Sequence, residues 1–335
     1  MKVLIINQSE VAELLPMNEC IETMAKALAT LARGEAIVPL RPVMWLPERV
    51  GALGMMPGYI GGEMQAMGVK VVSVFPGNHG TEYDSHQGTV LLFETKNGRL
   101  LSLMDASQIT ATRTAAVSGV ATRLLARDDA HDLAILGSGV QAKSHLAAML
   151  AVRGIQRVRV WSRNGEHARH FAQTQSQKHG LTIEVSDSVA EAVRGADIVC
   201  TTTAAPEPIL QAEWLSSGVH INAVGSSVAF ARELETAVVV QSRLYVDRRE
   251  STVNEAGDFL FPKKEGAVDD SHIVGEIGEI LLGKVAGRQN DEEMTLFKSL
   301  GLAVEDVASA YHIYKKAVVM GKGTWVELGG ERHEN

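Results

Sequence analysis

Cysteine and aromatic residues are scarce in this chain of 335 residues, which has 2 cysteines and 5% aromatics. Cys20 and Cys200 are far apart, and no C-x-x-C motif is present. Neither a disulfide framework nor a cysteine-rich metal centre is therefore expected. The 11 histidines are scattered through the sequence and form no cluster with metal-ligand spacing. We expect no bound metal.

Long apolar runs and an excess of positive charge are also missing. No segment approaches the ~20 apolar residues that span a membrane, and the N-terminal segment Met1–Asn7 becomes polar too early for a signal peptide. Lys and Arg number 32 against 40 Asp and Glu, a net charge of −8. This balance, with no basic stripe, argues against nucleic acid and membrane surfaces as partners. A cytoplasmic protein with a small-molecule partner is expected.

What is present indicates a globular protein of two domains. Hydrophobic residues make up 45% and charged residues 21% of the chain, an ordinary composition for a folded protein. A chain of 335 residues can bury a large core and exceeds the length at which single cores usually divide. The sequence has no internal repeat and no low-complexity linker.

The first 115 residues alternate short strands with turns rich in Pro and Gly. An opening strand leads to a helix that Ser9 is expected to cap, and a second helix follows over 17–33. Further strands are expected at 43–45, 51–56, 68–74, 89–94 and 99–105, with a hairpin turn before the last one. Many short strands with hairpin turns predict an antiparallel sheet, which could be curved or closed.

From Thr110 onward, helices and strands alternate. Strands are expected at 133–136, 158–161, 182–185, 198–201, 220–224 and 244–246. This alternation predicts a Rossmann-type, doubly wound parallel sheet that binds its ligand at the carboxyl ends of the strands. The tail 294–322 is expected to be helical and to return to the first domain. The predicted fold class is thus α/β, with a nucleotide-binding domain at 116–299 and a smaller, discontinuous α+β domain at 1–115 plus 300–335.

A short glycine motif opens the predicted nucleotide-binding domain, between a buried strand and a helix expected over 140–152. The start of a helix offers unpaired N–H groups and the positive end of its dipole to a pyrophosphate. Gly139 would let the backbone approach the phosphates. The candidate pyrophosphate-binding residues are Gly137, Ser138, Gly139, Val140 and Gln141. Because strand, turn and helix occur in this order, the motif predicts a dinucleotide site.

The end of the second strand of this domain indicates which dinucleotide is bound. An NAD enzyme usually has Asp or Glu about 20 residues after the glycines, where it accepts a hydrogen bond from the ribose 2′-hydroxyl. Here the first carboxylate is Glu166, and the strand ends in Ser162, Arg163 and Asn164. A guanidinium with two neutral hydrogen-bonding groups suits a 2′-phosphate. NADPH is therefore the preferred cofactor, with NADH possible; the alternative is that Arg163 is simply a solvated residue.

Two further loops are expected at the carboxyl edge of the same sheet. Thr201, Thr202 and Thr203 follow the fourth strand, and Val224 with Gly225 follows the fifth. Small residues there would let a nicotinamide ring lie against the backbone, because ligands of such sheets bind at the carboxyl ends of the strands. All five are candidate cofactor-binding residues.

The first domain carries cations in surroundings that do not favour them. Arg41 precedes a proline in a rigid turn, Lys70 lies in an apolar strand, and Arg113 lies in a helix of small residues. A buried cation is costly unless an anion meets it, so each is either part of an ordinary ion pair or part of a site for an anionic substrate. Three together favour a carboxylate clamp. Thr112 could donate to substrate or cofactor phosphate, or merely cap the helix.

Several motifs taken together resemble one family over essentially the whole chain. They are Met56–Pro57, the stretches 86–93 and 109–116, the glycine motif 137–142, and the stretch 297–306, which reads FKSLGLAVED. On these motifs the sequence resembles the ornithine cyclodeaminase/μ-crystallin family. The resemblance implies a two-domain subunit that dimerises through the sheet of its substrate domain.

The resemblance also implies roles for individual residues. Arg41, Lys70 and Arg113 would bind the substrate carboxylate, with Thr89 nearby. Beyond the resemblance, our hypothesis makes Lys70, Arg113 and Ser227 the catalytic set, with Lys70 holding or relaying a proton and Ser227 orienting the imine nitrogen or a water.

Two departures from the cyclodeaminase pattern favour a reductase within this family. Cyclodeaminases carry an aspartate where this chain has Ser227, and a glutamate where it has Gly54. A serine cannot act as a carboxylate base, and imine reductases of the μ-crystallin kind have serine at this position. The expected activity is NAD(P)H-dependent reduction of a cyclic ketimine carboxylate, Δ1-pyrroline-2-carboxylate or Δ1-piperideine-2-carboxylate, to proline or pipecolate.

Three other activities within the resemblance stay open. The chain could be an ornithine or lysine cyclodeaminase, which is a lyase that uses NAD+. It could aminate pyruvate as alanine dehydrogenases do. It could also be a non-catalytic protein that binds a ligand, as μ-crystallin binds thyroid hormone.

Overall fold

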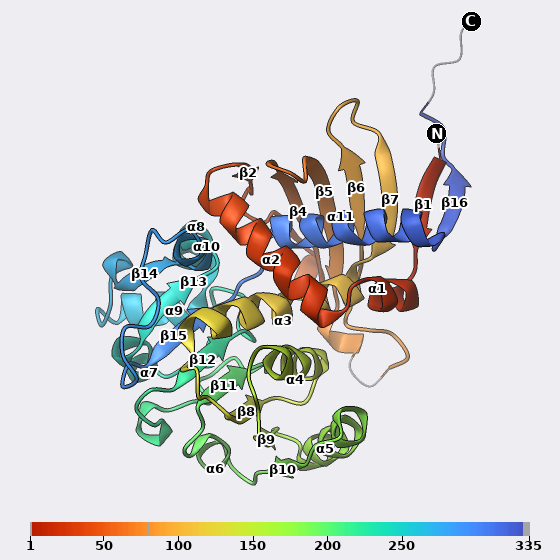
Figure 1. Ribbon diagram of the computed structural model, residues 1–335. Coiled ribbons are helices and arrows are strands. Elements are labelled where there is room, and N and C mark those ends of the chain that lie inside the picture. The colour runs from red at the N-terminus through yellow and green to blue at the C-terminus, as the bar shows by residue number, and fades with distance from the viewer. Residues whose placement is uncertain (1, 79–80, 331–335) are drawn as a thin grey trace, which may run out of the picture. The chain divides into compact units, whose positions relative to one another are not determined.

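The computed structural model describes residues 2–78 and 81–330, and the chain divides into two compact units (Figure 1). Unit 1 consists of Met1–Arg113 and Leu302–Asn335, and unit 2 consists of Thr114–Gly301. The chain leaves unit 1 within helix α3 (Ala106–Leu125) and returns to it just before helix α11 (Ala303–Met320).

Unit 1 is built on a sheet whose strands are β1 (Lys2–Ile6), β2 (Ala36–Ile37), β3 (Val43–Trp45), β4 (Ala52–Ile60), β5 (Ala66–Val74), β6 (His86–Glu94), β7 (Leu100–Asp105) and β16 (Thr324–Glu327). Their order is β16-β1-β7-β6-β5-β4-β2, and β3 pairs with β4 off this path. β1 runs parallel to β7, whereas β4 to β7 pair antiparallel. The sheet is therefore mixed, because the N-terminal strand adds beside β7 in the same direction.

Helix α11 lies across one face of this sheet, and α2 (Met17–Ala32) packs beside it (Figure 1). Two glycines of the sheet lie beneath α11. A Cβ added at Gly58 would approach the Cβ of Ala303 to 3.0 Å, and one at Gly68 would approach Val307 Cγ2 to 3.2 Å. Backbone without side chains at these positions lets the helix come close to the strands.

The first helix, α1 (Gln8–Leu14), begins with a capping box. The side chain of Asn7 accepts a hydrogen bond from the N–H of Glu10 at 3.0 Å, and the Glu10 carboxylate accepts one from the N–H of Asn7 at 3.0 Å. The cap is thus Asn7 rather than the expected Ser9, because the helix begins two residues earlier than a cap at Ser9 would place it.

Unit 2 is built on a parallel sheet whose strands are β8 (Asp132–Leu136), β9 (Arg157–Trp161), β10 (Ile183–Val185), β11 (Ile198–Thr201), β12 (His220–Ala223), β13 (Arg243–Val246), β14 (Ile273–Glu276) and β15 (Thr295–Lys298). Their order is β10-β9-β8-β11-β12-β15-β13-β14. The direction in which strands are added reverses between β8 and β11, which is where a doubly wound sheet opens a crevice for a ligand.

The helices of unit 2 are α4 (Val140–Val152), α5 (Gly165–His179), α6 (Val189–Val193), α7 (Thr236–Gln241), α8 (Arg249–Glu255), α9 (Gly257–Lys264) and α10 (Ile277–Leu281). One expectation for this unit is wrong. The stretch 295–298 is a fully buried strand between β12 and β13, not the start of the C-terminal helix. None of the helices in the described ranges is both long and apolar enough to cross a bilayer.

Candidate active site

The turn between β8 and α4 is open to an incoming ligand. Gly137 has a φ of 120°, and a Cβ there would lie 2.7 Å from the carbonyl oxygen of Thr202. Gly139 is the N-cap of α4; no side chain caps the first turn, and nothing lies within 4 Å of its Cβ position. Uncapped N–H groups at an open helix start suit a pyrophosphate. These residues fit a dinucleotide.

The end of β9 lies beside this turn. The hydroxyl of Ser138 donates to the hydroxyl oxygen of Ser162 at 3.0 Å, and the N–H of Gly137 donates to the carbonyl of Trp161 at 2.8 Å. Arg163 is exposed. Asn164 uses its side-chain oxygen to cap α5, accepting from the N–H of Glu166 at 2.9 Å. The strand end thus presents a guanidinium, a hydroxyl and an amide nitrogen, and no carboxylate before Glu166.

The loops after β11 and β12 are tied to each other and to β8. Thr202 donates from its N–H and its hydroxyl to the carbonyl of Leu136, at 2.8 and 3.0 Å. The N–H groups of Val224 and Gly225 donate to the carbonyl of Thr201, at 3.0 and 3.1 Å. Ser227 lies two residues further along the second loop and is half-buried.

A buried glutamate that the sequence did not single out joins these two loops. Oε1 of Glu233 accepts from the N–H and the hydroxyl of Thr203, both at 2.7 Å. Its Oε2 accepts from the Thr201 hydroxyl at 2.6 Å and from the N–H of Gly225 at 2.8 Å. Burial raises the pKa of Glu233 and the Asp258 carboxylate adds to this, while the threonine hydroxyls act in the opposite direction.

Asp258 and Lys298 extend this network. Oδ1 of Asp258 accepts from the N–H groups of Glu233 and Leu234, at 2.8 and 3.0 Å. Its Oδ2 accepts from Nζ of Lys298 at 2.9 Å, and both side chains are buried. The sequence does hold a signal for this network, because Lys298 ends the apolar run 295–298. A cation in apolar surroundings needs an anion nearby, which is the argument that singled out Lys70.

In unit 1, Lys70 and Arg113 meet on two carboxylates of α11. Arg113 donates from Nη1 to Glu305 at 2.7 Å and from Nε to Asp306 at 3.0 Å. Nζ of Lys70 lies 3.1 and 3.0 Å from the two oxygens of Asp306. All four side chains are buried, so the anions that these cations need come from the protein itself. Desolvation lowers the pKa of Lys70 to about 8.

Thr89 lies on the other face of the sheet. Lys70 pairs directly with Val90, and neighbouring residues of a strand point to opposite faces. The hydroxyl of Thr89 donates to the carbonyl of Met104 at 2.9 Å. The strand register therefore separates Thr89 from Lys70, which the resemblance had placed near each other.

The remaining two expected residues of unit 1 have separate settings. Arg41 lies between β2 and β3 and is partly exposed. Thr112 is buried and accepts a hydrogen bond from Gln108, one turn earlier, at 3.0 Å. Helix α3 begins at Ala106 rather than near Thr110, so Thr112 is an interior residue of the helix and not its cap.

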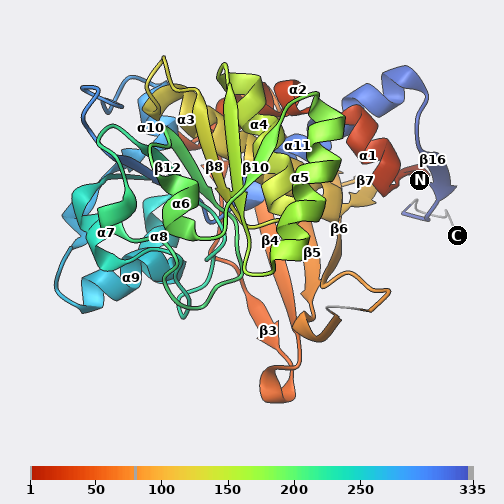
Figure 2. The ribbon, with the colours of Figure 1, turned by 90° about the horizontal axis from the view of Figure 1, so that it is seen from below.

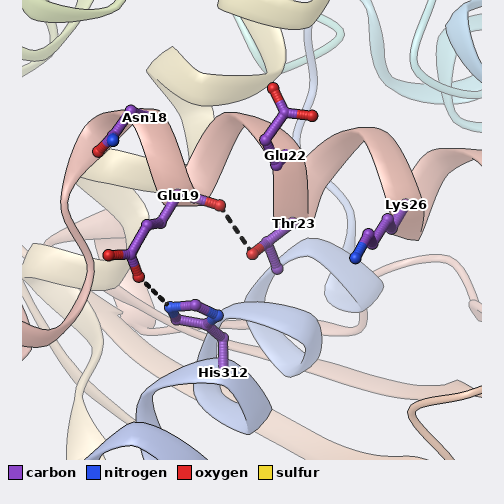
Figure 3. A pocket seen from close by; sticks show the side chains of 6 residues that line it. All are labelled: Asn18, Glu19, Glu22, Thr23, Lys26 and His312. Carbon is purple, nitrogen blue, oxygen red and sulfur yellow. Dashed lines mark hydrogen bonds and ion pairs between the residues drawn. The ribbon is translucent and has the colours of Figure 1, made fainter.

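A surface pocket of about 380 Å³ lies where α2 faces α11, and Figure 3 shows its side chains. Glu19 is one of the residues that line it, and its carboxylate accepts from Nε2 of His312 at 2.8 Å and from Nζ of Lys316 at 2.8 Å. The hydrogen bond from Lys316 is the main reason that the pKa of Glu19 is lowered. None of the expected site residues lines this pocket. Within residues 2–78 and 81–330, no three His, Cys, Asp or Glu side chains are grouped to hold a metal ion.

The sequence model of the ornithine cyclodeaminase/mu-crystallin family matches residues 1–321. The chain belongs to this family. It is 40% identical over 326 residues to Delta(1)-pyrroline-2-carboxylate reductase of Bacillus cereus, covering 97% of this chain and 100% of the relative. It is 42% identical over 297 residues to ketimine reductase mu-crystallin of Mus musculus, covering 88% and 90%.

A solved structure extends this likeness to three dimensions. Delta(1)-pyrroline-2-carboxylate reductase of Thermococcus litoralis, in complex with NADH and L-proline, superposes with a TM-score of 0.93 at 41% identity, over 96% of this chain and 99% of that chain. The expected family and α/β fold class are confirmed. These relatives support an oxidoreductase that uses a nicotinamide cofactor, but the NADH in that complex lends no support to a preference for NADPH.

The buried carboxylates of α11 predict a contrast in stability. Asp306→Ala removes the carboxylate that Lys70 and Arg113 share, and breaking a buried ion pair typically costs about 3–5 kcal/mol. Glu19→Ala, on α2, removes a half-exposed carboxylate whose contacts are worth about 0–1 kcal/mol. Urea unfolding followed by circular dichroism should show the larger midpoint shift for Asp306→Ala. Equal shifts for the two variants would contradict this assignment.

Proposed function

We propose that this chain is an NAD(P)H-dependent reductase of cyclic ketimine carboxylates, forming proline from Δ1-pyrroline-2-carboxylate or pipecolate from Δ1-piperideine-2-carboxylate. The observation that carries the proposal is the likeness of the whole chain to a reductase solved with NADH and L-proline. That likeness covers both units, so the proposed cofactor and substrate residues all fall within it.

Residues of unit 2 would bind the cofactor. Backbone N–H groups at the start of α4 meet the pyrophosphate, and the loops after β11 and β12 support the nicotinamide half. When bound, the cofactor supplies a hydride to the imine carbon. The proposed cofactor-binding residues are Thr112, Gly137, Ser138, Gly139, Val140, Gln141, Ser162, Arg163, Asn164, Thr201, Thr202, Thr203, Val224 and Gly225.

Residues of unit 1 would bind the substrate carboxylate. Arg113 and Lys70 are already paired with Glu305 and Asp306, so their pairs carry no net charge before substrate arrives. Lys70 also donates to the hydroxyl of Thr110 at 3.3 Å, so the N–H groups left over for a substrate carboxylate are those of Arg113. Lys70 would lie beside that carboxylate, and Arg41 would be a further donor. Pre-paired cations stay in fixed orientations, which favours positioning of the substrate over non-specific attraction.

Proton chemistry would fall to Lys70 and Ser227. Lys70, as an ammonium, would donate a proton to the imine nitrogen and take another from water, so that it relays the proton. Ser227 orients the nitrogen or a water and adds no charge. A lyase of the cyclodeaminase kind would need a carboxylate at this position, and the loop there offers a serine.

We expect the active form to be a homodimer that associates through the sheet of unit 1. Strand β3, which pairs with the start of β4, and the turn after it project beyond the rest of that sheet (Figure 2). This arm exposes Val43, Met44, Trp45, Val50 and Met55. A cluster of exposed apolar side chains of this kind suits contact with a second copy.

The activity is tested by following the absorbance of NADPH or NADH with each cyclic imine. Oxidation should occur with at least one imine and should not require ammonium. Ornithine cyclisation without imine reduction would instead identify a lyase. Ammonium-dependent oxidation with pyruvate would identify an alanine dehydrogenase, and ligand binding without turnover a binding protein.

Arg163 should control the choice of cofactor. Arg163→Ala removes a charge-assisted hydrogen bond worth about 1.5–3 kcal/mol to a 2′-phosphate, so KM for NADPH should rise about tenfold or more. KM for NADH should change less than about twofold on the same reasoning. Arg157→Ala is the control, because Arg157 starts the same strand and pairs with Glu184 at 2.7 Å. Equal changes for both cofactors would argue against a 2′-phosphate contact.

Lys70 should set the alkaline limb of the pH profile. Its pKa is lowered to about 8, so its ammonium is lost as the pH rises through that value. We expect kcat/KM for the imine to fall above about pH 8 in the wild type. Lys70→Arg keeps a charge at all these pH values, so its rate should be lower but the limb should move upward. An unmoved limb would assign it to another group, such as the imine itself.

A further inference from the structure

We infer that Glu233 is a positioning residue, which fixes the two loops that would carry the nicotinamide half of the cofactor. The inference rests on the proposed function, because it acts through residues proposed to bind that cofactor. Glu233 is fully buried at the end of the loop that follows β12. It would therefore act on the cofactor only through the loops, without touching it.

The four hydrogen bonds to Glu233 are divided evenly between its oxygens. Oε1 receives one backbone N–H and one hydroxyl, both from Thr203 after β11. Oε2 receives one hydroxyl from Thr201 and one backbone N–H from Gly225 after β12. One carboxylate therefore ties together two loops that backbone hydrogen bonds also join, from Gly225 to Thr201 and from Leu210 to the carbonyl of Glu233.

The two loops touch directly at this point. A Cβ added at Gly225 would overlap the carbonyl oxygen of Thr203 and the carboxylate of Glu233. Only glycine fits there, so the spacing of the loops is set by backbone contact as well as by the carboxylate.

The backbone at Glu233 is itself fixed by Asp258, which pairs with Lys298. The carboxylate of Asp258 accepts from the N–H groups of Glu233 and Leu234, and Lys298 pairs with the other oxygen of Asp258 at 2.9 Å. The network runs from the end of β15 to the loops after β11 and β12. A residue supported on both sides in this way can hold a loop geometry before the ligand arrives.

A carboxylate is required here because each oxygen faces a backbone N–H. Hydroxyl groups can rotate to accept, but an N–H cannot. In Glu233→Gln, either orientation of the amide turns its NH2 group toward the N–H of Thr203 or of Gly225. The substitution keeps the size of the side chain and still forces one donor against another.

The test compares two ligands. NADH has both halves of the cofactor, whereas ADP has the adenosine and the pyrophosphate but no nicotinamide. In Glu233→Gln, titration calorimetry should give a dissociation constant for NADH at least about tenfold higher, the effect of losing one such hydrogen bond. Binding of ADP should stay within about twofold, because its proposed contacts at Ser162 and Arg163, at the end of β9, are not bonded to Glu233 or its partners.

Glu235→Gln is the matched control. Glu235 lies two residues further on, is exposed, and makes one 3.3 Å contact with the N–H of Ala212. The substitution Glu235→Gln removes the same charge, and we expect no change in binding of either ligand. If Glu233→Gln does not fold, Thr201→Val removes one hydroxyl donor to the same carboxylate, and should weaken NADH about threefold to tenfold with ADP unaffected.

Equal weakening of NADH and ADP would overturn the inference, because it would indicate a general structural defect. Unchanged NADH binding would also overturn it. These binding measurements do not use the imine. A wild-type protein that binds NADH but reduces no imine would therefore refute the proposed function alone, whereas failure to bind either NADH or NADPH would refute both.

Discussion

The need to neutralise buried charge determines where the functional groups of both units lie. In unit 1, Asp306 of α11 meets both Lys70 of the sheet and Arg113 of α3. In unit 2, Asp258 joins Lys298 to the backbone beside Glu233. Breaking a buried pair is far more costly than breaking an exposed one, so each contact permits few alternative arrangements. The strand ends and loops that contact these buried ion pairs are therefore rigid as well.

This arrangement changes what can be inferred from a cation in an apolar strand. Lys70 and Arg113 are buried with their counter-ions, so their presence does not by itself report an absent ligand. What the paired state provides is fixed orientation, together with a lysine pKa low enough to exchange a proton near neutral pH. The proposed chemistry depends on that orientation, and the whole-chain likeness to imine reductases supplies the substrate class.

Local patterns predicted much of this structure and failed where distant residues decide. The helix over Val140–Val152 was expected with the bounds observed, because strand, glycine turn and helix are adjacent in the sequence. The partner of Lys70 lies 236 residues away on α11, and no local pattern reports such a contact. The face of the sheet on which Thr89 lies depends on strand register, which the sequence leaves open. The strand β15 (Thr295–Lys298) lies shortly before α11, so its apolar residues merge with the helical pattern of the tail.

Unit 2 is inserted into the sequence of unit 1, and this affects how the chain folds during synthesis. Thr114–Gly301 is uninterrupted, whereas its host is completed only by the segment from Leu302 onward. Domains tend to fold as they leave the ribosome, so the inserted unit can become compact while the host still lacks its last helix. Until Glu305 and Asp306 emerge, the two cations that they neutralise have no counter-ion. The sheet of unit 1 therefore stays solvated, or shielded by a chaperone, until the segment that carries these two carboxylates has left the ribosome.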